Sequence, residues 1–333
     1  MSRADEAAEG GPLPLGRGPT TPLSHRLAER AITAVAFLAI AAIALIFAFI
    51  LKEALPLFWE TALWPDIGGL DALFLPREWP GYEDAVFVWQ PVGAPSKLNV
   101  VPLLVGTLKV TTVAMFISVP MGVGSAIFVS QYAPRAAREV LKPCLELLAS
   151  IPSVVLGFFA LIVLATWLQG AFGFTYRLNA VVAALGLSLA VIPMIFTISE
   201  DALRAVPREL SEAAMALGAR KWQTTLRVVL PAALPGIAAA VILGFGRAIG
   251  ETMVVLMASG NAAVMELFDP TTSARTVTAT IAAELGEVAQ GDPHWRVLFL
   301  LGVLLFLITF ALNRLGAAVI ARLHRRLTAG ARA

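Results

Sequence analysis

Charged side chains are scarce in this sequence. Only 14% of its 333 residues are Asp, Glu, Lys or Arg, whereas 58% are hydrophobic and the mean hydropathy is +0.79. A soluble domain needs far more polar surface, so this composition indicates a protein whose outer surface faces lipid. The net charge of +2 is too small to suggest binding to nucleic acid.

Residue types that carry chemistry are also rare. Cys144 is the sole cysteine, which excludes an internal disulfide and a cysteine-based metal site. The histidines, His25, His294 and His324, lie far apart in the sequence, so a histidine metal cluster is not expected. No G-x-x-x-x-G-K-[ST] run occurs, and the chain therefore has no P-loop of its own. We predict no catalytic residue, no metal and no cofactor, and any ATPase would be a separate subunit.

The sequence does contain apolar runs long enough to span a bilayer. A transmembrane helix needs about 20 mostly apolar residues. The expected spans are 31–51, 104–129, 140–167, 180–199, 235–258 and 297–320. The predicted fold is therefore an all-α, six-helix membrane protein with a transmembrane domain over residues 31–325. Residues 1–30, rich in Gly, Pro and Arg, are expected to form a disordered tail and not a cleaved signal peptide, and residues 326–333 a C-terminal tail.

Basic residues are distributed unevenly between the two sides of these spans. The segments on the side of the N-terminus hold 17 of them: Arg3, Arg17, Arg26, Arg30, Arg135, Arg138, Lys142, Arg204, Arg208, Arg220, Lys221, Arg227, Arg314, Arg322, Arg325, Arg326 and Arg332. The opposite segments hold six: Lys52, Arg77, Lys97, Arg177, Arg275 and Arg296. Because cytoplasmic loops carry the excess of Lys and Arg, both termini are predicted to be cytoplasmic in a multi-pass protein of the plasma or inner membrane.

Residues 52–100 form the longest segment on the outer side. They contain Trp59, Trp64, Trp79 and Trp89, several prolines and an acidic excess. Tryptophan is favoured at the membrane interface, so we interpret this segment as an ordered external loop that rests there. Recognition of a soluble partner is the alternative interpretation.

Residues 205–231 are predicted to form a cytoplasmic helix–turn–helix. Pro207 suits the first turn of a helix, and apolar residues then recur at helical spacing up to Leu217. Gly218 can end this helix in the left-handed conformation, and a second short amphipathic helix is expected to run up to Pro231. Glu212-Ala213-Ala214, then Gly218, then V-x-L-P at 228–231 resembles the EAA loop of ABC importer permeases, with Val228 in place of the usual isoleucine. That resemblance implies that Glu212, Ala213, Ala214 and Gly218 contact an ATPase subunit and transmit its closure.

The fifth expected span carries two charges near its middle. Arg247 and Glu251 are four residues apart, hence on one face of a helix. A charge at the bilayer centre costs about 2.5–3.5 kcal/mol on insertion scales, so these side chains are expected to face protein or a watery pathway. A pair that only stabilises the helix bundle is the alternative. The surrounding glycines are expected to permit close helix packing: Gly244, Gly246 and Gly250.

The run GRAIGETM at 246–253 resembles the phosphate permeases of ABC importers, of the PstC type. Sulfate and molybdate permeases have a similar R-A-x-G-E run but usually lack the Thr-Met that follows. The stretches KPCLELLASIPSVVLGF at 142–158 and TATIAAELGE at 278–287 agree with the same family, and the resemblance covers roughly residues 100–325. It implies a phosphate pathway that includes Arg247, Glu251 and Thr252, and no ATPase site in this chain.

The resemblance also implies partners. These are a second permease subunit (PstA-like), a pair of ATPase subunits (PstB-like), an external phosphate-binding protein (PstS-like) and membrane lipid. Three alternatives remain open: a permease for sulfate or molybdate, an ion-coupled secondary transporter, and a structural membrane scaffold. The EAA-like loop argues against the secondary transporter, which has no ATPase to contact, and the charges within the fifth span argue against the scaffold.

A few further residues carry weaker expectations. Lys109, in the outer half of the second span, is expected to extend its ammonium to the interface, and lining the pathway is the alternative. Pro152 should bend or break the third span. Glu284 and Glu287 are expected to be solvated outside the membrane, where contact with a substrate-binding protein is the alternative.

Overall fold

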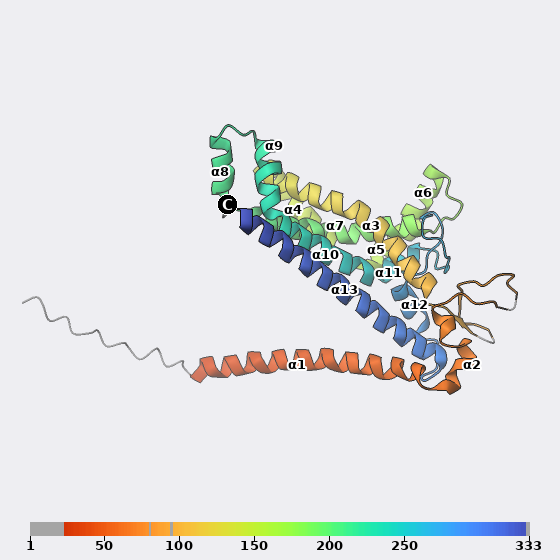
Figure 1. Ribbon diagram of the computed structural model, residues 1–333. Helices are drawn as coiled ribbons and strands as arrows, with labels where there is room; N and C mark the ends of the chain where they lie inside the picture. The colour runs from red at the N-terminus through yellow and green to blue at the C-terminus, as the bar shows by residue number, and fades with distance from the viewer. Residues whose placement is uncertain (1–22, 80, 94–95, 331–333) are drawn as a thin grey trace, which may run out of the picture. The chain divides into compact units, whose positions relative to one another are not determined.

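The computed structural model describes residues 23–79, 81–93 and 96–330, and its elements are almost all helices (Figure 1). The chain divides into two compact units, residues 1–49 and 50–333. The described part of the first unit is helical and belongs to α1 (Leu23–Ala54), which continues into the second unit. Most of the expected tail at 1–30 lies outside the described residues, but residues 23–30 are helical, and for them the prediction of disorder is wrong.

The second unit holds the remaining elements. Its helices, in chain order, are α2 (Trp64–Ile67), α3 (Val101–Ile127), α4 (Arg135–Ser150), α5 (Ser153–Phe159), α6 (Ala165–Phe172), α7 (Ala180–Arg204), α8 (Arg208–Ala216), α9 (Lys221–Thr224), α10 (Leu230–Gly250), α11 (Met253–Ala258), α12 (Val277–Glu284) and α13 (Pro293–Gly330). Strands β1 (Trp89–Gln90) and β2 (Lys97–Leu98) pair antiparallel, with Trp89 opposite Leu98. Three turns of 3₁₀ helix, η1 (Leu55–Phe58), η2 (Thr61–Leu63) and η3 (Asp71–Leu73), precede the strands. Three π-helical turns continue α3, α5 and α9: η4 (Phe128–Tyr132), η5 (Ala160–Leu164) and η6 (Thr225–Val229).

Six helical segments within the described residues are long and apolar enough to cross a membrane, which confirms the predicted fold class. They are Leu27–Phe58, Val101–Tyr132, Ser153–Phe172, Ala180–Arg204, Lys221–Gly250 and Pro293–Leu323. Most are longer than the apolar runs in the sequence, because the helices continue beyond the apolar run at one or both ends.

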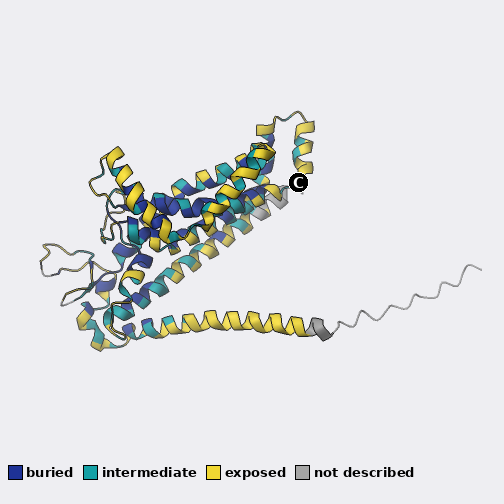
Figure 2. Ribbon diagram, turned by 180° about the vertical axis from the view of Figure 1, so that it is seen from behind, coloured by how far each residue is buried: buried dark blue, intermediate teal, exposed yellow. Residues whose placement is uncertain are grey.

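Helix α7 forms the centre of the second unit. Its residues Ala183, Leu187, Val191 and Ile195 are fully buried and pack with residues of α3, α5 and α11 (Figure 2). The outward faces of the surrounding helices are apolar but exposed, with Phe116 82% exposed on α3 and Trp167 on α6 64% exposed. Apolar side chains can face outward in this way because lipid, not water, is their solvent.

The third span differs from its prediction at 140–167. Residues 135–150 form α4, a separate helix that has no buried residue, and the span itself begins at Ser153. The helix breaks because Ile151 and Pro152 are extended, with ψ angles of 127° and 138°. Proline lacks the N–H that would continue the helix and disfavours helical geometry at the residue before it. The expected effect of Pro152 is therefore confirmed, whereas the inclusion of 140–150 in the span is wrong.

Segment 52–100 folds into an ordered layer at the start of α3. Asn99 is buried there and donates from Nδ2 to the carbonyls of Ala72 and Leu75, both at 2.8 Å, while its Oδ1 accepts from the backbone N–H of Val101 at 3.0 Å. Trp79 and Trp89 are buried within this layer, at 5% and 6% exposure. Interfacial anchoring is thus the wrong interpretation for these two side chains, since they form core.

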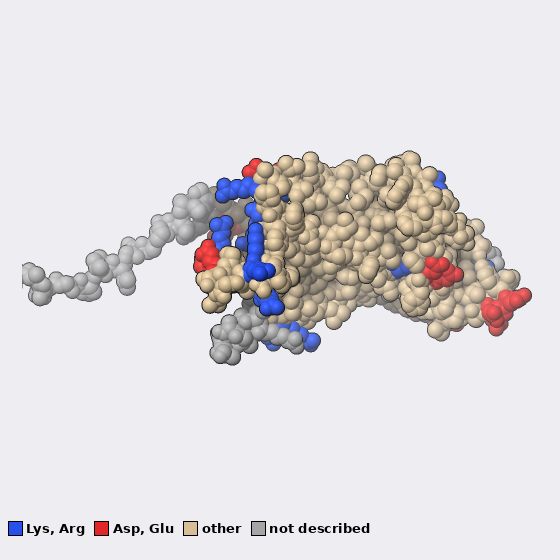
Figure 3. All heavy atoms as spheres, turned by 90° about the horizontal axis from the view of Figure 1, so that it is seen from above, with Lys and Arg blue, Asp and Glu red and all other residues tan. Residues whose placement is uncertain are grey.

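Charged residues gather at the two ends of the second unit. Figure 3 shows Lys and Arg concentrated around α8 and α9, Asp and Glu at both ends, and mainly uncharged residues between the two ends. The C-terminal end of α13 lies at the same end as α8 and α9, and the 52–100 layer lies at the opposite one (Figure 1). This arrangement matches a span with an uncharged belt between two polar surfaces.

Candidate translocation site and cytoplasmic coupling surface

The fifth span is interrupted within the predicted site. Helix α10 ends at Gly250, Glu251 is extended with φ −70° and ψ 131°, and α11 begins at Met253. Two threonine hydroxyls satisfy the carbonyls that the break frees. Thr252 Oγ1 donates to the carbonyl of Gly250 at 3.3 Å, and Thr278 Oγ1 of α12 donates to that of Glu251 at 2.9 Å. Interrupted helices in membranes occur where such groups, or a cavity, can satisfy the backbone.

This break separates Arg247 from Glu251. Arg247 lies in the last turn of α10 and is exposed on this chain, while Glu251 is half-buried and its Oε1 accepts from the backbone N–H of Thr252 at 3.2 Å. No ion pair involves either residue in the part of the chain that the structure describes. The expectation that both side chains share one helix face is wrong, because Glu251 lies outside the helix, and the two residues form no ion pair in the described part of the chain.

The three glycines of α10 have different surroundings. A Cβ on Gly244 would lie 2.9 Å from Ile195 of α7, so this glycine permits the close packing of α10 on α7. Around Gly246 and Gly250, no atom among the described residues would lie within 4 Å of such a Cβ. Beside Gly246 and Gly250, α10 therefore borders space that none of the described residues fills.

An ordered loop, residues 259–276, follows the interrupted span and packs on α3. Lys109 is 3% exposed, and its Nζ donates to Thr272 Oγ1 at 2.8 Å and to the carbonyl of Asp269 at 3.2 Å. A Cβ on Gly106 would come 2.2 Å from the carbonyl oxygen of Arg275, so the loop backbone lies directly against α3. The expectation that Lys109 reaches the membrane interface is wrong, because loop oxygens at the outer end of α3 satisfy its ammonium.

Asp269 stabilises the turn that meets Lys109. Its Oδ1 accepts from both Thr271 Oγ1, at 2.6 Å, and the Thr271 backbone N–H, at 2.8 Å. These hydrogen bonds, and to a smaller degree the charge of Lys109, lower the pKa of Asp269 below its ordinary value of 3.8. The carboxylate therefore stays ionised, and the turn stays intact, over the ordinary pH range.

Glu284 joins three segments of the chain, and the expectation that its side chain is solvated is wrong. Its carboxylate accepts from Trp89 Nε1 at 3.1 Å, lies 2.8 Å from His294 Nε2 and forms an ion pair with Arg275. Glu287 is exposed. The carboxylate of Glu284 thus ties the 52–100 layer to α12 and to the start of α13.

Residues 205–231 form the expected helix–turn–helix at the other end of the molecule. Helix α8 is followed by Gly218 with φ +86°, a left-handed conformation that glycine adopts without strain. No described atom would lie within 4 Å of a Cβ on Gly218, so the requirement for glycine comes from the backbone and not from packing. The second helix differs from its prediction, because α9 and η6 run without interruption into α10 instead of ending at Pro231.

Helix α8 exposes much of its surface. Leu210 is 46% exposed, Met215 48% and Leu217 91%, and the residues of the EAA-like motif lie among them, with Glu212 and Ala213 exposed and Ala214 half-buried. An amphipathic helix whose apolar side chains have no cover in this chain has the form of a docking surface.

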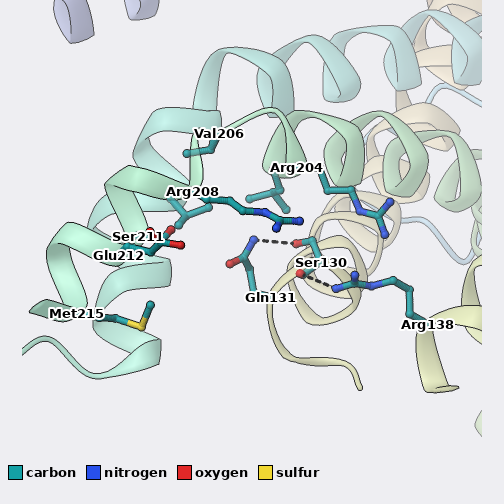
Figure 4. Close-up of a pocket in the computed structure, with 11 residues that line it drawn as sticks. Ser130, Gln131, Arg138, Arg204, Val206, Arg208, Ser211, Glu212 and Met215 are labelled. Carbon is teal, nitrogen blue, oxygen red and sulfur yellow. Dashed lines mark hydrogen bonds between the residues drawn. The ribbon is translucent and has the colours of Figure 1, made fainter. Parts of the chain in front are cut away.

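A pocket of about 450 Å³ opens between α8 and the ends of α3, α4 and α7 (Figure 4). Figure 4 shows Arg208 extending from α8 toward Ser130 and Gln131, and Arg138 approaching the same turn from the other side. The sequence reasoning used these arginines only to assign the cytoplasmic side, and it missed the pocket. They lie in segments up to 70 positions apart that only the fold brings together.

Comparison with known proteins places the chain among transporters. Residues 118–328 match the family of binding-protein-dependent transport system inner membrane components. A probable ABC transporter permease protein, YqgH of Bacillus subtilis, is 36% identical over 222 residues, which are 67% of this chain and 72% of that protein. The phosphate transport system permease protein PstC of Mesorhizobium japonicum is 36% identical over 259 residues, 72% of this chain and 77% of the relative.

The fold has counterparts among solved structures. A chain in the crystal structure of a bacterial alginate ABC transporter in complex with its alginate pentasaccharide-bound periplasmic protein superimposes with a TM-score of 0.55, covering 87% of this chain and 94% of that one. The sequence identity between them is 17%, so this likeness concerns the fold alone.

Proposed function

Because this chain belongs to the family of binding-protein-dependent transport system inner membrane components, we propose that it is the permease subunit of an ATP-driven importer of inorganic phosphate. The observation that carries the substrate is its 36% identity to the phosphate permease PstC of Mesorhizobium japonicum over 259 residues. The family match over residues 118–328 includes both the interrupted fifth span and the loop at 205–231.

Arg247, Glu251 and Thr252 are the proposed pathway residues. The planar guanidinium of Arg247 can form bidentate, charge-assisted hydrogen bonds with a tetrahedral oxyanion. A carboxylate at Glu251 can accept a hydrogen bond from the hydroxyl of hydrogen phosphate, which fully ionised sulfate lacks. The exposure of Arg247 and the space beside Gly246 and Gly250 support a pathway that is completed by a second permease subunit (PstA-like).

The proposed coupling route runs from α8 to this pathway along one helix. The exposed side of α8, with Glu212, Ala213 and Ala214, would dock on an ATPase subunit (PstB-like). From Lys221 the helix continues unbroken to Gly250, over 30 residues, and so spans roughly 45 Å at 1.5 Å per residue. Movement of the cytoplasmic loop would therefore reach the break at Glu251 through a single rigid element.

The remaining partner is an external phosphate-binding protein (PstS-like), for which the 52–100 layer and the 259–276 loop offer the outer surface. Cytoplasmic placement of both termini is part of this proposal and is supported by the basic residues around α8 and α9. The exposed side of α8 argues against an ion-coupled secondary transporter, because such a transporter has no ATPase subunit for this surface to contact.

Uptake of radiolabelled phosphate tests the function. Cells that lack phosphate import are given the complete transporter with this chain, without it, or with Glu212→Lys as a coupling-deficient control. We expect uptake that depends on this chain, resists excess sulfate or molybdate, and is lost in Glu212→Lys while the protein remains in the membrane. Competition by sulfate or molybdate at equal concentration would instead assign the permease to those oxyanions.

A further inference from the structure

The pocket beneath α8 contains an unusual set of hydrogen-bond donors for its size. Three arginines line it, from three different helices: Arg138 of α4, Arg204 of α7 and Arg208 of α8. The hydroxyl of Ser211 and the amide of Gln131 add neutral donors, whereas the Ser130 hydroxyl, which also lines the pocket, donates to the carbonyl of Ile127 at 3.4 Å and accepts from Gln131 Nε2 at 3.4 Å. Glu212 is the one carboxylate among the residues that line it, so the lining has an excess of positive charge.

Some of these donors are already engaged, and their partners fix the walls of the pocket. Arg138 donates from Nε to the carbonyl of Val129 at 3.1 Å and from Nη2 to that of Ser130 at 2.8 Å, which pins the π-helical turn η4. Arg204 forms an ion pair with Glu200, whose side chain is completely buried and also pairs with Lys142 at 3.1 Å. These bonds leave Nη1 of Arg138 and both terminal nitrogens of Arg204 without a protein acceptor among the described residues.

Arg208 is the least engaged of the three. No hydrogen bond or ion pair holds its guanidinium within the described part of the chain, and Figure 4 shows it extended into the pocket toward Ser130 and Gln131. Buried Leu203 and Val229 form an apolar part of the wall. An apolar wall lowers the local dielectric constant, so a charge held beside it interacts more strongly with an ion of opposite sign than it would in water.

We propose that this pocket is a binding site for a phosphate group on the cytoplasmic side, separate from the transport pathway. Guanidinium forks, hydroxyls and an amide from several directions suit a tetrahedral oxyanion, which accepts hydrogen bonds on every side. A volume of about 450 Å³ exceeds that of one phosphate and accommodates bound water or the remainder of a phosphate ester. Free phosphate and the headgroup of an anionic lipid share this chemistry.

The position of the pocket allows a bound phosphate group to restrain the movement of α8. Arg208 belongs to α8, whereas Arg138 and Arg204 belong to the transmembrane bundle, so a bound phosphate group joins the coupling helix to helices α4 and α7. Resting on the function proposed above, imported phosphate that accumulates in the cytoplasm would occupy the pocket, restrain α8 and slow further import.

Binding of radiolabelled inorganic phosphate to the assembled transporter in phosphatidylcholine nanodiscs tests the site. All variants carry Arg247→Gln, so that the proposed pathway contributes little. Arg208→Gln is expected to weaken binding about tenfold or more, the effect of losing a charge-assisted hydrogen bond. Arg135→Gln, an exposed arginine of α4 that does not line the pocket, is the matched control and should bind phosphate normally. If Arg208→Gln fails to assemble, Arg208→Lys, which keeps the charge without the fork, is expected to show a smaller loss.

Equal phosphate binding by Arg208→Gln and the parent, or equal weakening by Arg135→Gln, would overturn the proposal. Nanodiscs that contain phosphatidylglycerol distinguish the two sources. Competition by this lipid that disappears in Arg208→Gln would identify a headgroup as the occupant, and unchanged binding would identify free phosphate.

Proteoliposomes preloaded with phosphate test the restraint on α8, with Arg247 intact. Initial uptake should slow in the parent and much less in Arg208→Gln. Equal slowing in both would refute the restraint. A complete lack of uptake would count against the proposed function, while the binding series would still decide whether the site exists.

Discussion

Replacement of Arg247 by glutamine distinguishes two roles of this residue, because a side chain in the transport pathway and one that faces lipid respond differently to the loss of charge. The side chain is exposed on this chain, so it contacts a partner subunit, water or the bilayer. A glutamine keeps a polar side chain that donates hydrogen bonds, but it is shorter, has fewer donors and removes the charge. Glu251→Gln is the companion change, because glutamine retains an acceptor for the backbone N–H of Thr252, which Glu251 Oε1 now satisfies.

The expected magnitudes differ between the two environments. A charge at the bilayer centre costs about 2.5–3.5 kcal/mol, so a lipid-facing Arg247 would make Arg247→Gln insert and assemble better than the parent. In an aqueous pathway the insertion energy changes little. Loss of a charge-assisted hydrogen bond to the anion then weakens its binding by about 1.5–3 kcal/mol, or roughly 10- to 100-fold.

Both quantities should be measured on the same cells, as radiolabelled phosphate uptake and as the amount of assembled complex. We expect Arg247→Gln to assemble normally and to lose most uptake, and the double variant with Glu251→Gln to stay inactive. A structural ion pair would behave differently, since removing both charges would restore what removing one had destroyed. Recovery of uptake in the double variant, or normal uptake with increased assembly in Arg247→Gln, would refute the assignment.

Three further predictions concern other parts of the chain. Gly218→Ala should destabilise the loop at 205–231 by about 1–2 kcal/mol and reduce uptake, because Gly218 has a φ of +86°. Gly218→Asn should have a smaller effect, since asparagine adopts this conformation more readily than alanine. Hydrogen exchange of α8 measures the difference, and equal behaviour of the two variants would contradict the backbone explanation. Lys109→Met should free the 259–276 loop from α3, so external protease should cleave the loop faster than in the parent or in the Lys52→Met control, and unchanged cleavage would show that Lys109 is not the tether. In a Cys144→Ser background, a new cysteine at the C-terminus should resist an impermeant thiol reagent applied from outside, while one in the 52–100 layer should react; the reverse pattern would invert the topology.

Much of the fold follows from composition, but the interruptions of the helices follow from it only in part. The break at Pro152 could be predicted, because a proline in an apolar run removes a donor whatever surrounds it. The break at Glu251 could not, since the run from Ala248 to Met257 has no proline and keeps an apolar pattern that suits a helix. What permits that break is the hydroxyl of Thr278, on a helix 27 residues further along the chain, which satisfies the carbonyl of Glu251.

Arg138, Arg204 and Arg208 show a second limit of the sequence. Counting the basic residues predicts which side of the membrane these arginines face, because the positive-inside rule depends on the charges near the ends of the spans and not on their contacts. The count does not predict where each arginine lies in the fold. An arginine at the level of the lipid headgroups can be solvated without a protein partner. Arg138 nevertheless donates to two carbonyls of η4, and Arg204 pairs with the buried Glu200. These bonds hold both side chains in place, whereas Arg208 remains extended into the pocket that they border. Arg208 is thereby positioned to bind a ligand, although the predicted orientation alone would place it in solvent. Arg135 carries the same charge and is predicted on the same side of the membrane, so only the packing of α4, α7 and α8 distinguishes the two arginines.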